Sequence, residues 1–448
     1  MASLRGGESV EDRVARLAEA ARRDPHNVYV SLDVEAAMAR ARALDRGPRE
    51  GRLFGLVVSV KDNLAVAGQR MTCGSRVLET YVAPYTATVV ERLEREGAVV
   101  LGKTNLDEFA CGSSGENSAF GPTRNPRDSS RVPGGSSSGA GASVAAGLAD
   151  LAVGSDTGGS VRCPAAFCGA SALKPSYGLV SRHGLADLAM SLESPAPIAA
   201  SSEGLSLFLD VAAGPDPRDP VTRTAAPARA EGDVARPRFA LVREMFVGVD
   251  ADVERRVREA ASRLAPEAVE VSIPALSEAL GSYYLLNYAE FASAMQRYDG
   301  YRYGARPGPD RGLVETTMGN RAVFGPEVRR RIALGTYVTM KEHRDRWYGL
   351  ALAARERVRQ GFERAFREAD LLLAPTMPFA AFRLGERVED PLSMYAADVL
   401  TVAANLAGIP AASTPVRSPG LPVGLQVLGP RGADRRVLSA LRTWEAMA

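Results

Sequence analysis

Short apolar runs alternate with amphipathic segments along this chain, and this alternation restricts the fold more than any other sequence feature. The runs at 52–60, 98–101 and 148–153 have the length and composition of buried strands. A segment with apolar residues at helical spacing, 86–96, lies between the first two. Strands that alternate with helices predict an α/β fold. We expect a single large mixed, mostly parallel β-sheet that is covered by helices on both faces.

The chain has 448 residues, which is enough for one large α/β unit or for two domains. We interpret residues 1–448 as one domain that begins with an N-terminal helical arm, 1–50, because 8–24 and 31–45 are amphipathic. Stretches rich in Pro, Gly and charged residues predict surface loops at 214–237 and 304–312. Further strands are predicted at 238–243, 268–272, 369–374 and 423–428, and further helices at 205–213, 253–264, 276–296, 328–366 and 437–447.

The composition excludes several classes of protein. Hydrophobic residues make up 46% and charged residues 24% of the chain, as in soluble globular proteins, and the formal net charge of +2 is too small for a nucleic-acid footprint. No long apolar run occurs, and residues 1–14 carry charges where a secretion signal is apolar, so we expect a cytoplasmic protein without membrane contact. The four cysteines lack zinc-ligand spacing, so we expect reduced thiols and no metal site.

A glycine turn follows the strand predicted at 148–153, in the sequence Gly154-Ser155-Asp156-Thr157-Gly158-Gly159-Ser160-Val161-Arg162. Paired glycines allow backbone amides to converge on one point, because no Cβ blocks the approach. A serine at the end of such a turn can be a nucleophile beside its own oxyanion donors. On this segment alone, a plain strand-to-helix turn is equally consistent with the pattern.

A serine nucleophile needs a base, and none of the three histidines is near Ser160 in the sequence. Lys61 ends the apolar run at 52–60, where burial would lower the pKa of its ammonium and make it a general base. The alternative is a lysine paired with Asp62 or with another acid. Lys103, at the end of the next predicted strand, is the rival candidate.

A serine cluster opens the alanine-rich segment that ends at Gly147. These serines can simply cap a helix. Phosphate binding is disfavoured because the lysine-serine pair of a P-loop is missing. A hydroxyl both accepts and donates a proton, so Ser136 can relay a proton between Ser160 and Lys61.

Three blocks of the sequence together resemble the amidase signature family: Lys61 in Ser59-Val60-Lys61-Asp62-Asn63, the block Pro133-Gly134-Gly135-Ser136-Ser137, and the turn at 154–162. The resemblance implies a Ser, cis-Ser, Lys triad in which Ser160 attacks an amide, Ser136 relays the proton and Lys61 is the base. It also implies an oxyanion hole of the amides of Thr157, Gly158, Gly159 and Ser160. Asp156 and Arg162 match residues that brace this turn, which leaves Lys103 a structural role.

Within this family the chain looks most like the A subunits of glutamine-dependent aspartyl/glutamyl-tRNA amidotransferases, over residues 50–200 and 275–440. The resemblance implies glutamine as substrate, held by Tyr303, Arg331 and Asp398. It implies a heterotrimer with B and C subunits, in which the partner subunit binds most of the tRNA and uses ATP and Mg²⁺, with no cofactor in this chain. The acceptor could be glutamyl-tRNA(Gln) or aspartyl-tRNA(Asn).

Some residues depart from the family pattern without removing a triad atom: Ser138, Ala140, 168–172 and Ser191-Leu192-Glu193-Ser194-Pro195, where an aspartate-glutamine version is usual. These departures affect the expected shape of the substrate pocket, and hence which amide it prefers. Two other functions therefore stay open, a stand-alone amidase acting on small or aromatic amides and a non-catalytic scaffold.

Overall fold

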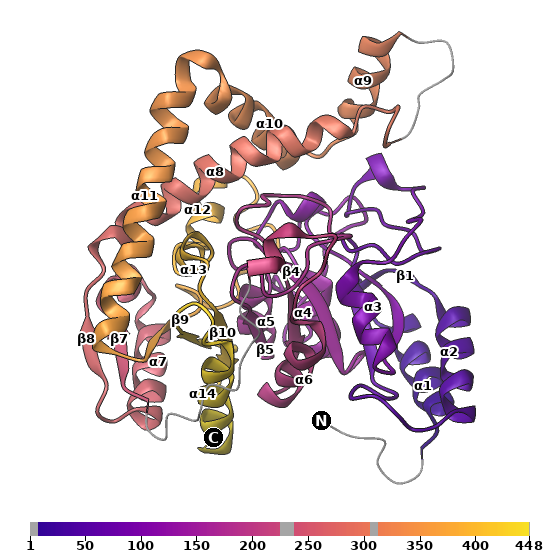
Figure 1. Ribbon diagram of the computed structural model, residues 1–448, viewed down its shortest axis with the longest axis horizontal. Coiled ribbons are helices and arrows are strands. Elements are labelled where there is room, and N and C mark those ends of the chain that lie inside the picture. Colours follow the sequence, from indigo (N-terminus) through magenta and orange to yellow (C-terminus); the bar gives the residue numbers. More distant parts are fainter. Residues whose placement is uncertain (1–7, 225–236, 305–311, 448) are drawn as a thin grey trace.

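The computed structural model describes residues 8–224, 237–304 and 312–447. Its centre is one sheet of eleven strands in the order β1-β3-β2-β4-β6-β5-β10-β11-β9-β7-β8 (Figure 1). The strands are β1 (Tyr29–Leu32), β2 (Val57–Lys61), β3 (Val99–Thr104), β4 (Leu151–Asp156), β5 (Ser171–Lys174), β6 (Ser194–Ala199), β7 (Phe239–Val242), β8 (Val269–Val271), β9 (Leu371–Pro375), β10 (Ala411–Pro415) and β11 (Gly424–Leu428).

The mixed sheet is confirmed, but the expectation that it is mostly parallel is wrong. Six of the ten pairings between neighbouring strands are antiparallel. The parallel pairings are β2 with β3 and β4, and β7 with β8 and β9. The error arose because β1, β5, β6 and β10 were not predicted. A strand that returns without a helical crossover can run antiparallel, and β6 does so between β4 and β5.

Helices cover both faces of the sheet, as predicted. They are α1 (Val10–Arg22), α2 (Val34–Arg46), α3 (Thr88–Arg95), α4 (Ser138–Ala145), α5 (Arg162–Cys168), α6 (Ser202–Ala212), α7 (Ala251–Leu264), α8 (Ala279–Ala294), α9 (Leu313–Ala322), α10 (Pro326–Thr339), α11 (Lys341–Glu368), α12 (Pro391–Ala396), α13 (Val402–Ala407) and α14 (Asp434–Met447).

Alternation along the strands decides which face each side chain joins. Leu151 and Val153 of β4 pack with α3 and α6 in the largest apolar cluster, which α7 and α14 extend over the distant strands. Ala152, between them, packs on the other face with α4 and α5. On that same face α8, α11 and α13 cover β7, β9 and β10. Figure 1 shows α8, α10 and α11 as an arch beyond the sheet, with α9 at its outer end.

The predicted N-terminal arm does contain two helices, α1 and α2, in its described part. It also contains the unpredicted edge strand β1, which pairs antiparallel with β3. Apolar residues of α1 and α2 pack against Val57, Val99 and Leu101 of the sheet. The described part of the arm is therefore packed on the sheet.

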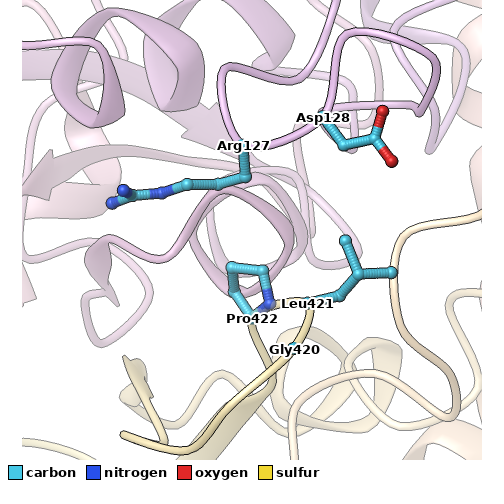
Figure 2. A pocket seen from close by; sticks show the side chains of 5 residues that line it. All are labelled: Arg127, Asp128, Gly420, Leu421 and Pro422. Carbon is cyan, nitrogen blue, oxygen red and sulfur yellow. The ribbon is translucent and has the colours of Figure 1, made fainter.

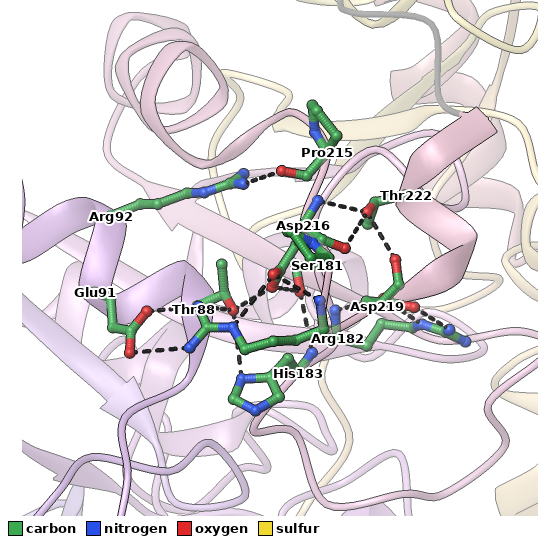
Figure 3. Close-up of polar contacts among 12 residues, drawn as sticks. Thr88, Glu91, Arg92, Ser181, Arg182, His183, Pro215, Asp216, Asp219 and Thr222 are labelled. Atoms are coloured by element: carbon green, nitrogen blue, oxygen red, sulfur yellow. Dashed lines mark hydrogen bonds and ion pairs between the residues drawn. The ribbon is translucent and has the colours of Figure 1, made fainter.

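The predicted loop at 214–237 is described up to residue 224, and residues 225–236 lie outside the described residues. Its described part is held by charged groups, as Figure 3 shows. Asp216 accepts a 2.6 Å hydrogen bond from the Ser181 hydroxyl, and Asp219 is paired with the Arg182 guanidinium. Of the predicted loop at 304–312, residues 305–311 lie outside the described part of the chain.

A helix that crosses a membrane must be both long and apolar. Within the described ranges, no helix meets both conditions.

Candidate active site

Lys61 is the last residue of β2, a central strand between β3 and β4. Its side chain is fully buried, and its Nζ lies 2.9 Å from the Ser136 Oγ and 3.0 Å from the Ser155 Oγ. Burial lowers the pKa of Lys61 to about 7, against the opposing attraction of nearby acids. The lowered pKa favours the uncharged amine near neutral pH, which is the form that a general base requires.

The acid that follows Lys61 in the sequence does not neutralise it. Asp62 instead pairs with Lys103, whose Nζ lies 3.0 Å from the Asp62 carboxylate. Asp62 also accepts a hydrogen bond from the Thr72 amide at 2.9 Å. Lys103, the rival candidate for the base, is therefore held in a buried ion pair.

Ser136 lies in the glycine-rich turn before α4 and is fully buried. The Gly135–Ser136 peptide bond is cis. The Gly135 amide donates to the Ser113 carbonyl at 2.9 Å, and the Ser137 amide donates to the Ser160 carbonyl at 3.1 Å. The second of these bonds joins the Ser136 turn to the Ser160 turn, although 24 residues separate the two serines.

Ser160 lies between the end of β4 and the start of α5. It is partly exposed, whereas every residue from 151 to 159 is buried. A partly exposed serine at the end of a buried turn has the accessibility that a nucleophile needs.

The glycine turn places backbone amides around Ser160. The Gly159 amide donates to the Asp156 carboxylate at 2.9 Å, so in this arrangement it already has an acceptor. Among the described contacts, the amides of Thr157, Gly158 and Ser160 make no hydrogen bond to the protein. Thr157 is buried directly after β4. Three of the four predicted oxyanion donors are therefore free at this turn.

Both glycines of the turn are required by their surroundings. A Cβ on Gly158 would lie 2.5 Å from the Tyr283 hydroxyl and ring. A Cβ on Gly159 would collide with Thr401, and the φ of Gly159 is +134°, which side chains rarely adopt. The Thr401 hydroxyl also donates to the Gly158 carbonyl at 2.5 Å, which fixes the peptide plane that follows Gly158.

Asp156 and Arg162 stabilise the glycine turn through a buried ion pair, and this agrees with the supporting role that the family resemblance implies. Their side chains form a buried ion pair with two hydrogen bonds, at 2.9 and 3.1 Å. Burial alone would raise the pKa of Asp156, but the Arg162 guanidinium lowers it to about 2. Arg162 also donates to the Gln426 and Asn405 side chains, at 2.8 and 2.7 Å. The turn is thereby tied to β11 and α13.

Asp398 lies next to the turn. The Thr401 amide and hydroxyl both donate to the Asp398 carbonyl, at 3.0 and 3.1 Å. Its buried carboxylate accepts hydrogen bonds from the hydroxyls of Ser113 and Tyr284, each at 2.7 Å. Burial raises the pKa of Asp398 to about 6, and the two hydroxyls oppose that rise. Asp398 is therefore mostly ionised at neutral pH.

Arg331 of α10 is buried beside the same tyrosine, with its guanidinium 5.7 Å from the Tyr284 ring centre. Its Nε donates to Glu327 at 2.7 Å and an NH group donates to the Asn287 amide oxygen at 3.2 Å. The structure thus brings Arg331 and Asp398 to one neighbourhood around Tyr284, with Arg331 partly neutralised by Glu327.

Tyr303 lies elsewhere, in an aromatic cluster with Tyr81 and Tyr298 at ring-centre distances of 5.8 and 5.9 Å. Its side chain is 39% exposed. Among the described contacts, Tyr303 does not touch Asp398 or Arg331.

Five residues of the site were not predicted: Asn63, Ser113, Ser155, Tyr284 and Thr401. Two of them had a local signal. Asn63 is two residues from Lys61, and Ser155 is in the glycine-turn motif, on a strand that pairs with that of Lys61. The other three reach the site only through the fold.

Figure 2 shows a surface cavity of about 630 Å³ that is lined by Arg127, Asp128 and the loop 420–422. None of these residues belongs to the predicted triad. Within the described ranges, no group of three or more His, Cys, Asp and Glu side chains could hold a metal ion. All four cysteines are buried and free of disulfides.

The sequence was compared with known protein families and with solved structures. A family model described as amidase matches residues 8–438. The chain belongs to the amidase family. The A subunit of glutamyl-tRNA(Gln) amidotransferase from Thermus thermophilus is 50% identical to it over 93% of this chain and 89% of that protein.

Two solved structures of such proteins have the same fold. The A subunit of glutamyl-tRNA(Gln) amidotransferase from Thermotoga maritima superposes with a TM-score of 0.80 at 36% identity, over 98% of this chain and 92% of that one. A peptide amidase from Stenotrophomonas maltophilia gives a TM-score of 0.80 at 30% identity, with the same coverage. The amidase fold therefore accommodates both kinds of relative.

Proposed function

We propose that this chain is the glutamine-hydrolysing A subunit of a tRNA-dependent amidotransferase, with glutamyl-tRNA(Gln) as the acceptor. The observation that carries the proposal is the 50% identity to a protein of that name over 93% of the chain. The Lys61–Ser136 contact beside a glycine turn supports it, because this arrangement can activate a serine toward an amide.

In the proposed first step, Ser136 accepts the proton of the Ser160 hydroxyl and passes its own proton to uncharged Lys61. The Ser160 Oγ bonds to the side-chain amide carbon of glutamine, and the carbonyl oxygen takes up the negative charge. The free amides of Thr157, Gly158 and Ser160 would donate to this oxyanion, and Gly159 completes the predicted set. Each such donor is typically worth about 2.7–4 kcal/mol of barrier.

In the second half of the reaction, the proton moves in the opposite direction. Lys61 returns its proton through Ser136 to the leaving nitrogen, the C–N bond breaks, and ammonia departs from a glutamyl ester on Ser160. A water molecule then attacks the ester, with Ser136 and Lys61 again accepting the proton, and glutamate and free Ser160 result. Two easier steps thus replace one difficult step.

Asp398 and Arg331 are the proposed contacts for the two charged ends of glutamine. An ionised carboxylate suits the α-ammonium, and a guanidinium suits the α-carboxylate through two parallel hydrogen bonds. Tyr303 is the third proposed contact for glutamine. Because it lies in a separate aromatic cluster, this contact requires the cluster to approach the bound substrate.

The partners follow from the same proposal. We propose that B and C subunits complete a heterotrimer, that the partner subunit binds the tRNA and uses ATP and Mg²⁺, and that this chain needs no cofactor of its own. The complex would work in the cytoplasm. In support, the relatives are named as subunits of an amidotransferase.

Ammonia release from glutamine tests the function, measured for the chain alone and with its B and C subunits. We expect release with the partners present and none in Ser160→Ala, while Ser262→Ala, at an exposed position of α7, keeps its activity. Release from peptide or aromatic amides but not from glutamine would instead indicate a stand-alone amidase. Unchanged assembly without any turnover would indicate a scaffold.

A further inference from the structure

The Lys61 side chain has a second polar contact besides Ser136. Its Nζ donates to the Ser155 Oγ at 3.0 Å, and the Asn63 Nδ2 donates to the same oxygen, also at 3.0 Å. The three side chains are buried. Ser155, which also accepts a hydrogen bond from Asn63, thus positions the Lys61 amine. The contact of this amine with Ser136 is the one used in the proposed proton transfer.

Three buried oxygen atoms in this region have no hydrogen-bond partner among the described residues: the Asn63 Oδ1, the Glu193 Oε1 and the Oγ of the adjacent Ser194. The Asn63 and Glu193 side chains are each 1% exposed. An acceptor buried without a donor costs about 1–3 kcal/mol. A proton on the Glu193 carboxyl, or a buried water molecule, would supply the missing donor.

One short segment, 186–193, contacts Asn63 and contains Glu193. The Ala186 amide donates to the Asn63 backbone carbonyl at 2.9 Å, and the Leu188 amide donates to the other Glu193 oxygen at 3.2 Å. Glu193 also directly precedes β6, which pairs with the strand of Ser155. The fold therefore brings Glu193 into the same region as Asn63 and Ser155.

Glu193 lies within electrostatic reach of Lys61. Burial raises the pKa of Glu193 to about 8, which favours the protonated form of its carboxyl. An ionised Glu193 would favour the Lys61 ammonium and remove the base. The charged and titratable groups that act on Lys61 are Asp107, Asp156, Glu193 and Cys73. Those that act on Glu193 are Asp187, Arg182 and Glu290.

We propose that Glu193 is a positioning residue that holds a proton next to Asn63 and thereby keeps Lys61 available as an uncharged base. The Glu193 hydroxyl donates to the Asn63 Oδ1, directly or through one buried water. Asn63 in turn donates to Ser155, which orients the Lys61 amine toward Ser136. The inference rests on the proposed function, because it assumes that Lys61 is the general base.

Infrared difference spectroscopy of the full chain tests the proton directly. The spectrum of the wild type minus that of Glu193→Gln should contain the carbonyl stretch of a protonated carboxyl at pH 7, and this band should disappear as the pH rises through about 8. No protonated-carboxyl difference at pH 7 would overturn the proposal.

The pH dependence of Ser160 labelling by a fluorophosphonate tests the effect on Lys61 without glutamine. Glu193→Gln, which mimics the protonated acid, should keep the midpoint of the wild type. Asn63→Asp should move the midpoint upward by about one pH unit, because it places a charge beside Lys61.

The rate of the same labelling tests whether Glu193 is needed. Glu193→Leu, checked for folding by thermal unfolding, should label at least about tenfold more slowly. Glu94→Gln, a half-buried acid on α3, is the matched control and should change nothing.

The outcomes separate this inference from the proposed function. A midpoint about one unit lower in Glu193→Gln would mean that Glu193 is ionised, and normal labelling of a folded Glu193→Leu would mean that it has no role. Either result overturns the inference. Labelling that behaves as expected in a chain that does not hydrolyse glutamine would refute the proposed function and leave the inference standing.

Discussion

Lys103 and Asp62 form a fully buried ion pair with a distance of 3.0 Å, one residue along the chain from Lys61. Because the Asp62 carboxylate is paired with Lys103, it does not stabilise the charged form of Lys61. Two lysines at the ends of neighbouring parallel strands thus have different roles, because only one of them has an acid within contact distance.

Replacement of each lysine by methionine should separate these roles. Lys61→Met should lower ammonia release by about 10²–10⁴-fold, because the base is lost. Its free energy of unfolding should stay near that of the wild type, since an apolar side chain replaces a desolvated amine. Lys103→Met should cost about 3–5 kcal/mol of unfolding free energy, because Asp62 is left buried and unpaired. Urea unfolding and ammonia assays of the two variants measure both effects. Equal loss of stability in the two would contradict this distinction.

The rate of Ser160 acylation should depend on the ionisation of Lys61. The base acts when it is unprotonated, so activity is present above the pKa of about 7 and is lost as the pH falls through it. Below that value kcat/KM should fall about tenfold per pH unit. A pH profile of glutamine hydrolysis measures this limb. A profile that is flat down to pH 5 would exclude a buried lysine as the base.

Substitution of Gly158 should remove activity through the backbone. In Gly158→Ala the new methyl group would lie 2.5 Å from the Tyr283 hydroxyl, so the turn must move and its amides lose their alignment. We expect kcat to fall about 10²–10³-fold, as when one oxyanion donor is removed. Gly281→Ala in α8 is the control, because a Cβ there meets nothing within 4 Å. Full activity of Gly158→Ala would show that the turn does not contribute the donors.

Asp398 should affect the binding of glutamine more than its chemistry. Asp398→Asn removes the charge that attracts the α-ammonium, so KM should rise by at least about tenfold with a smaller change in kcat. In the wild type, KM should rise as the pH falls through about 6, because the carboxyl then gains a proton. Steady-state kinetics with glutamine measure both changes. Asp390→Asn, which alters only the N-cap of α12, should leave KM unchanged.

Much of the fold could be predicted because periodicity is a local signal. Of the predicted strands and helices, those around Lys61, Ser160 and α7 were found within a few residues of their predicted bounds. β5, β6 and β10 were missed because they are short and are interrupted by Ser, Thr and Pro. Their absence from the prediction also explains the error in strand direction.

The sequence by itself determined the chemistry that is available: a lysine at a strand end, a serine before a helix and a serine after paired glycines. Those features depend on neighbours within a few residues. Only the tertiary structure decided which groups meet. The pairing of Lys103 with Asp62 joins residues 41 positions apart, and the contact of Ser113 with Asp398 joins residues 285 positions apart. The electrostatic effect of Glu193 on the pKa of Lys61 acts between residues 132 positions apart. Such contacts depend on strand order and burial, and a local pattern contains neither.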